Sequence, residues 1–273
     1  MQGASREALK RALASFDESI GSLPAGAGSH DVSEGLYAVA ALLDREPSLR
    51  RALTDPASTP DSRRGLVDAL LGGQLAPLPL GVLSDLVADR WGSSADLRTA
   101  VEQLAATAAM SAAEGEGVLD EVEDELFRFA RLLEREHSLR AALTDPGLPA
   151  ERKLSLLRDL IGGKTQPVTV RLIEIAVTRP HTGSLESALE ALSRLAAQRR
   201  HRYVAQVRVA RPLDADQEQR LGASLARIYG REVALQVDVD PTVLGGIEVR
   251  VGDEVIDGTV ERRLQGVRRS FAG

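Results

Sequence analysis

The sequence predicts an α+β protein that is mostly helical: two homologous small helical bundles, followed by a small C-terminal α/β domain with a short mixed sheet. Two observations predict this fold class. A phrase of fifteen residues occurs twice, ninety positions apart, and the hydrophobic period changes from helical to strand-like after Arg200. The 273 residues are enough for more than one domain.

The repeated phrase reads LLDREPSLRRALTDP at Leu42–Pro56 and LLEREHSLRAALTDP at Leu132–Pro146, with twelve of fifteen positions identical. The similarity continues at the same offset, from RRGLVDALLGG at Arg63–Gly73 to KLSLLRDLIGG at Lys153–Gly163. The sequence therefore indicates that a whole domain of about 90 residues is duplicated.

The second copy shows the helical pattern most clearly. Apolar residues at three- and four-residue spacing predict one buried helix face, made of Val118, Val122, Leu126, Phe129, Ala130 and Leu133. The phrase that follows ends at Asp145-Pro146, because a residue before proline avoids the α conformation. A further helix is expected from about Ala150 to Ile161, ended by Gly162 and Gly163. Two more are expected over 168–177 and 184–199.

The first copy is expected to begin with a helix over residues 1–20. A helix over about 95–113 closes this copy and can also lead the second one. The predicted domains are 1–117 for the first bundle, 118–200 for the second and 201–273 for the C-terminal domain.

The C-terminal domain alternates apolar and polar residues, which predicts half-buried strands over 202–210, 233–240 and 246–251. A helix that starts near Asp214 and stops at Gly230 lies between the first two strands. Gly245-Gly246 is expected to form a hairpin, and Asp257 to begin a last helix over 259–271. The predicted order is strand, helix, strand, strand, helix.

Composition excludes several classes of function. The chain has no cysteine, so it holds neither a disulfide nor a thiolate metal site. Its net charge is −6, its aromatic content is 3% and no basic patch is visible, which argues against nucleic-acid binding. No apolar run approaches the roughly 20 residues of a membrane helix, and the N-terminus lacks a signal-peptide core. We expect a cytoplasmic chain that can reach a membrane complex only through a partner.

Candidate chemical motifs are weak. The Gly162–Thr165 stretch, GGKT, lacks the earlier glycine of a phosphate-binding loop and follows a helix rather than a strand. The four histidines, at 30, 137, 181 and 201, have no ligand-like neighbours at helical spacing. The carboxylates of Asp120–Phe129 read as the solvated face of an amphipathic helix, or as a surface for a basic partner. We therefore predict no catalytic residue, no metal site and no cofactor.

The stretch DVDPTVLGGIEVRVGDEVIDGTVERRLQGV, Asp238–Val267, is the most distinctive part of the chain. It resembles the C-terminal signature of the delta subunits of F-type ATP synthases, the family that includes the oligomycin-sensitivity-conferring protein. The matching residues are Asp240, Leu244, Gly245, Gly246, Ile247, Gly252, Asp253, Asp257, Gly258, Thr259 and Leu264, with threonine at 259 where members often have serine.

The family's helical domain also carries a segment that Leu139, Leu143, Asp145, Pro146 and Lys153 match. The resemblance covers roughly residues 95–273. The preceding helical copy exceeds an ordinary delta subunit and is similar to actinobacterial forms.

The resemblance implies a non-catalytic role in the peripheral stalk of a proton-translocating ATP synthase, at the cytoplasmic face of the plasma membrane. The implied partners are the alpha subunits of the catalytic head, gripped by the helical domain, and the b subunits of the stalk, met by the C-terminal domain. Such a stator resists the torque of the rotor during ATP synthesis.

Two other functions stay open at this stage: a helical adaptor outside that complex, and a phosphoryl-transfer enzyme at Gly163-Lys164-Thr165. Within the stator interpretation, the second helical copy is expected to bind the head, and the first copy to pack on stalk subunits.

Overall fold

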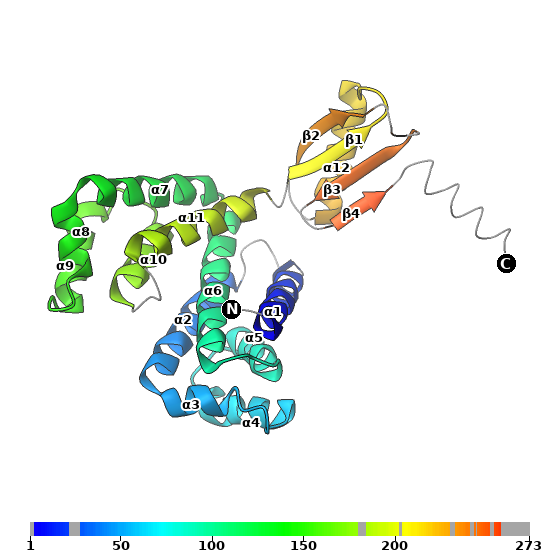
Figure 1. Ribbon diagram of the computed structural model, residues 1–273. Helices are drawn as coiled ribbons and strands as arrows, with labels where there is room; N and C mark the ends of the chain where they lie inside the picture. Colours follow the sequence, from blue (N-terminus) through cyan, green and yellow to red (C-terminus); the bar gives the residue numbers. More distant parts are fainter. Residues whose placement is uncertain are drawn as a thin grey trace. The chain divides into compact units, whose positions relative to one another are not determined.

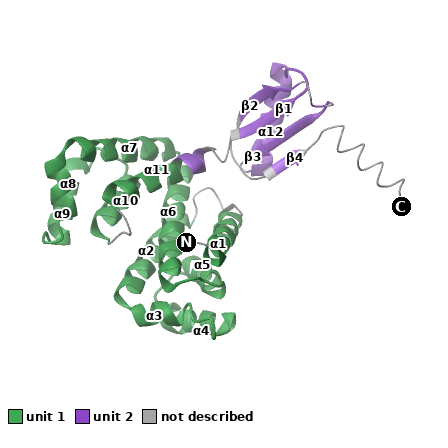
Figure 2. Ribbon diagram, in the orientation of Figure 1, with its two compact units in different colours: residues 1–196 green, residues 197–273 purple. Residues whose placement is uncertain are grey.

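The computed structural model describes residues 3–21, 28–179, 184–201, 204–229, 233–240, 243, 245–251 and 254–257 (Figure 1). The chain divides into two compact units, residues 1–196 and residues 197–273 (Figure 2). The first unit is helical and the second carries a mixed sheet. This confirms the predicted fold class.

The helices of the two copies begin ninety residues apart. The first copy consists of α1 Ala4–Gly21, α2 Ser29–Arg45, α3 Pro47–Ala52, α4 Pro60–Leu71, α5 Pro77–Ala88 and α6 Ser94–Gly115. The second continues with α7 Leu119–Arg135, α8 His137–Thr144, α9 Ala150–Ile161, α10 Pro167–Thr178 and α11 Leu185–His201. At this offset α2, α3, α4 and α5 correspond to α7, α8, α9 and α10. Helix α1 corresponds to α6, so α6 ends the first copy and also stands where the first helix of the second copy would be.

Helix α6 is the structural link between the copies. It packs on α2 and α5 of the first copy and on α7 and α10 of the second (Figure 1). All its residues from 104 to 113 are buried, and six of these ten are alanine, so helices of both copies can approach it closely. The core runs without a break from Ala8 to Ala196. The separate bundles 1–117 and 118–200 stay a prediction.

The repeated phrase has the same local structure in both copies. The carboxylate of Asp55 accepts a hydrogen bond from the backbone N–H of Ala57, and Asp145 does the same for Gly147, at 2.9 and 2.8 Å. Each closes an Asx turn, which starts the chain toward the next helix. Leu143 is buried and Leu139 packs on the core. The phrase is therefore repeated for structural reasons.

The expected glycine stop of α9 is also confirmed. Gly163 has φ +69°, a conformation in which glycine avoids the strain of a side chain. A Cβ on Gly162 would lie 2.3 Å from the carbonyl oxygen of Arg158, which is too close for any side chain.

The second unit holds β1 Val204–Val209, α12 Ala215–Tyr229, β2 Ala234–Val239, β3 Ile247–Val251 and β4 Glu254–Asp257. The strand order is β2-β1-β3-β4, with β1 and β2 parallel and the other neighbours antiparallel. Helix α12 packs on one face of the sheet, where Leu225 joins a small core with Ala205, Val207, Val249 and Val251. Across the other face, Arg208 pairs with Asp240 and Glu248.

Two sequence expectations for this unit are wrong. Gly245-Gly246 does not close a hairpin, because β1 lies between β2 and β3; the two glycines, with φ +94° and +86°, turn a longer connection. Strand β4, which ends at Asp257 and pairs with β3, is absent from the predicted order of elements.

Part of the family signature and the expected last helix lie outside the described residues. These are Leu244, Gly252, Asp253, Gly258, Thr259, Leu264 and the range 259–271.

Candidate helix-docking groove

The catalytic alternatives receive no geometric support. Within the described ranges, His, Cys, Asp and Glu side chains form no group of three or more that could hold a metal ion. The GGKT stretch lies at the C-terminal end of α9, where Lys164 Nζ donates to the carbonyl of Leu160 at 3.0 Å. Carbonyl oxygens and the negative end of the helix dipole repel a phosphate there.

A groove between α1 and α5 is the best candidate for a binding site. It encloses a hollow of about 160 Å³. Its lining residues are mostly small or apolar: Ala12, Ser15, Phe16 and Ser19 from α1, and Pro77, Leu78, Gly81, Val82 and Asp85 from α5. A Cβ on Gly81 would meet no atom within 4 Å, so the groove is open above this glycine.

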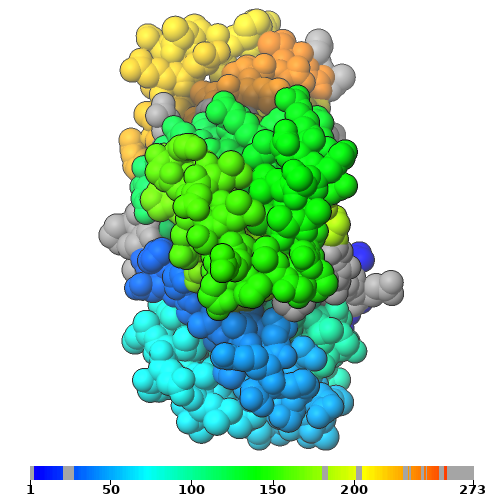
Figure 3. Space-filling view, turned by 90° about the vertical axis from the view of Figure 1, so that its left-hand side faces the viewer, coloured from blue at the N-terminus to red at the C-terminus, as the bar shows by residue number. Residues whose placement is uncertain are grey.

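The equivalent faces of the second copy, on α6 and α10, are covered by α2. Gly81 corresponds to Arg171, which donates to both carboxylate oxygens of Glu34 on α2 at 2.9 and 2.7 Å. The counterparts of five other lining positions are buried: Ala105, Ala106, Ala109, Leu172 and Ile175. In Figure 3 the green surface of the second copy lies directly against the blue surface of the first. Thus a helix of the chain itself occupies the corresponding surface.

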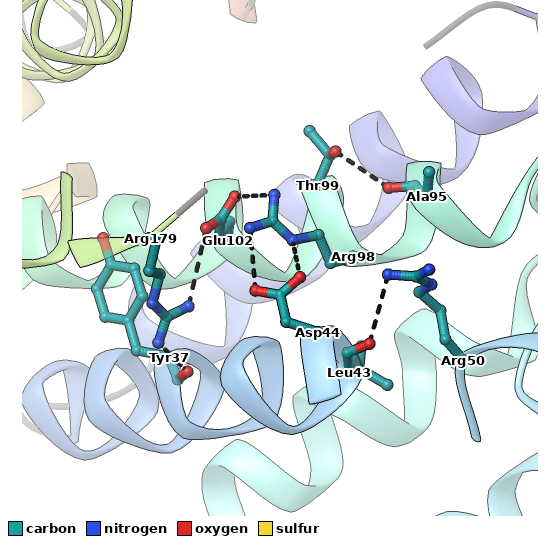
Figure 4. A network of polar contacts seen from close by, with 9 residues as sticks. All are labelled: Tyr37, Leu43, Asp44, Arg50, Ala95, Arg98, Thr99, Glu102 and Arg179. Carbon is teal, nitrogen blue, oxygen red and sulfur yellow. Dashed lines mark hydrogen bonds and ion pairs between the residues drawn. The ribbon is translucent and has the colours of Figure 1, made fainter. Parts of the chain in front are cut away.

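A polar network holds α2 in this position (Figure 4). Arg98 of α6 binds both carboxylate oxygens of Asp44 at 2.8 and 3.1 Å, and Glu102 at 2.9 Å. Arg179, which follows α10, donates to the carbonyl of Tyr37 and lies over its ring, 5.1 Å from the centroid. The first contact ties α2 to α6, and the second ties it to the segment that follows α10 in the second copy.

The pKa values of three groups at this contact are shifted by their surroundings. The hydrogen bond from Arg171 lowers the pKa of the Glu34 carboxyl. Burial raises the pKa of the Tyr37 hydroxyl and lowers the pKa of the Arg179 guanidinium. These shifts are those expected for groups that are paired or removed from water, and they need no bound ligand.

Glu125 has a role that the sequence did not indicate. It was expected on a solvated face, but its carboxylate accepts from the backbone N–H of Gln166, and from the hydroxyl of Thr169, at the start of α10. In the first copy the same position is Gly35, and Pro79 of α5 would lie 2.9 Å from a Cβ there. The two copies therefore position equivalent helices by different means.

The residues singled out from the sequence lie elsewhere. Lys153, in the first turns of α9, belongs like the repeated phrase to the scaffold, and Asp240 pairs with Arg208 in the sheet unit. Sequence reasoning missed the groove. A comparison of the copies position by position, with Gly81 against Arg171, was the available signal.

A helical unit with an open groove, joined to a small sheet unit, defines a class of protein that binds partners. The comparisons identify the family. The family described as "ATP synthase delta (OSCP) subunit" matches residues 101–271. The chain therefore belongs to the ATP synthase delta (OSCP) subunit family, as its signature indicated.

Relatives named "ATP synthase subunit delta" match the whole chain. The protein from Streptomyces griseus is 52% identical over 273 residues and covers 100% of both chains. The one from Parafrankia sp. is 50% identical and covers 99% of both. A solved structure of the Toxoplasma gondii mitochondrial ATP synthase hexamer contains a similar chain, with 24% identity and a TM-score of 0.33, over 62% of this chain and 95% of that one.

Proposed function

We propose that the chain is the stator subunit that links the catalytic head of a proton-translocating ATP synthase to its peripheral stalk. It is not catalytic itself. Proton flow turns the rotor, and an equal torque acts on the head, so a stator must hold the head still for ATP to form. The match to delta subunits along the whole chain carries this proposal. The partners are the alpha subunits of the head and the b subunits of the stalk.

The chain acts as a peripheral subunit. None of the helices within the described ranges is long and apolar enough to span a membrane. Its place is the cytoplasmic face of the plasma membrane, where it is held by its partners.

The α1–α5 groove is the docking site for a helix of the head. The sequence favoured the second copy for this role. However, α2 already covers the corresponding faces of α6 and α10, whereas the groove of the first copy is open. An amphipathic helix laid in an apolar groove is a common recognition mode, and α2 on α6 and α10 is an example within this chain.

Co-elution of the full chain with a purified ATP synthase head that lacks its own delta subunit tests this function. We expect stoichiometric co-elution for the wild type. Gly81→Phe should abolish it, because the ring fills the groove, while Gly81→Ala should retain it. Gly65→Phe is a matched control, since Gly65 lies in α4 and a Cβ there also meets no atom within 4 Å. If the wild type does not bind, an adaptor role outside the complex becomes the better account.

A further inference from the structure

The two copies differ in the charge of the helix that forms the wall of the groove. Arg171 of α10 and Arg179, which follows that helix, both contact α2. At the equivalent positions the first copy has Gly81 in α5 and Asp89 directly after that helix. In addition, the buried Ile175 of α10 is replaced in α5 by Asp85, which lines the groove. The wall is therefore cationic in the second copy and anionic in the first.

Asp85 is the acidic group best placed to meet a bound helix. Its side chain is 60% exposed, and Arg64 approaches it at 3.8 Å from α4, itself 43% exposed. An exposed pair at this distance contributes little, so a new cation can replace it. Asp89, by contrast, already binds Arg11 of α1 at 2.8 Å.

We propose that the α1–α5 groove selects an amphipathic helix that carries a lysine or arginine where α2 carries Glu34. This rests on the proposed function, since it describes the partner of the same groove. A helix placed like α2 would put residue 34 above Gly81, and Asp85 lies one turn further along α5. The long stem of a lysine or arginine spans that turn, whereas a glutamate there would meet a like charge.

The opposite charges on α10 and α5 also keep the helix-binding surfaces of the two copies distinct. Glu34 forms an ion pair with Arg171 of its own chain, whereas Asp85 of a second molecule would repel it. This discourages exchange of α2 between two copies of the chain, an arrangement that the duplication would otherwise permit. The open groove is therefore reserved for a basic partner helix.

Two labelled peptides test the proposal: the α2 sequence Ser29–Arg45, and the same peptide with Glu34→Lys. Their affinities for the intact chain are measured by fluorescence anisotropy at low salt. We expect the Glu34→Lys peptide to bind about fivefold more tightly, and this preference to shrink as salt rises. Asp85→Lys in the chain should reverse the preference. Asp159→Lys, an equal charge change on the exposed side of α9, should leave it unchanged.

Equal affinity for both peptides would overturn the proposal, as would an unchanged preference in Asp85→Lys. Failure of both peptides to bind would show that the groove does not take a helix like α2. Circular dichroism of each variant confirms that the fold is retained. Co-elution with the head tests the stator function separately. If the chain binds the head but binds both peptides with equal affinity, only the proposed preference for a basic helix is wrong.

Discussion

Replacing Arg98 should destabilise the helical unit more than any exposed ion pair does. The Arg98 side chain is 10% exposed and joins Asp44 of α2 to Glu102 of its own helix, whose side chains are 23% and 17% exposed. Arg98→Ala would leave two largely buried carboxylates close together without this cation. Burial of an uncompensated charge is costly, because water no longer solvates it.

The expected loss follows from this burial. Breaking a buried pair costs about 3–5 kcal/mol. Since both carboxylates keep some contact with water, we expect about 2–4 kcal/mol for Arg98→Ala. At about 2–4 °C per kcal/mol for a unit of this size, Tm falls by roughly 4–16 °C. Thermal unfolding followed by circular dichroism measures this shift.

Two further variants make the test specific. Arg131→Ala breaks an exposed pair with Glu134, 58% and 53% exposed, and should cost less than about 0.5 kcal/mol. The double variant Arg98→Ala, Asp44→Ala should lose less than the sum of its single variants, because one stranded carboxylate is removed. A Tm change for Arg98→Ala no larger than that for Arg131→Ala would refute the reasoning.

Four other outcomes follow. Glu125→Ala should cost about 1–2 kcal/mol in urea unfolding, because the start of α10 loses its cap. Leu126→Ala should cost about 2–5 kcal/mol in the same assay, since this side chain is fully buried. Gly163→Ala should lower Tm, with a loss of about 1 kcal/mol, because φ is +69° there. The hydrogen bond from Arg171 lowers the pKa of Glu34, so this pair stabilises the fold fully above the unfolded pKa of about 4.3. The stabilisation is lost as pH falls through the lower pKa of the folded state. In Arg171→Ala, NMR titration should show the Glu34 pKa rise toward its ordinary value.

Much of the fold could be predicted because its signals are local. The period of Val122, Leu126 and Leu133 marks the buried face of α7, and the Asp145-Pro146 pair marks the end of α8. Each of these depends on residues close together in the sequence.

The rest depends on tertiary contacts that no local pattern encodes. The central place of β1 separates β2 from β3, and β4 was missed because its short run pairs only with β3. Likewise, Glu125 looks like any solvated carboxylate until α10 is placed beside it. The groove appears only once α2 is seen to cover one copy and not the other.

The most direct test of the stator account is proton-driven ATP synthesis by the reconstituted ATP synthase depleted of this subunit. The account predicts that synthesis is lost on depletion and returns when the wild-type chain or Gly65→Phe is added, but not with Gly81→Phe. Full synthesis without the chain, or full recovery with Gly81→Phe, would contradict it.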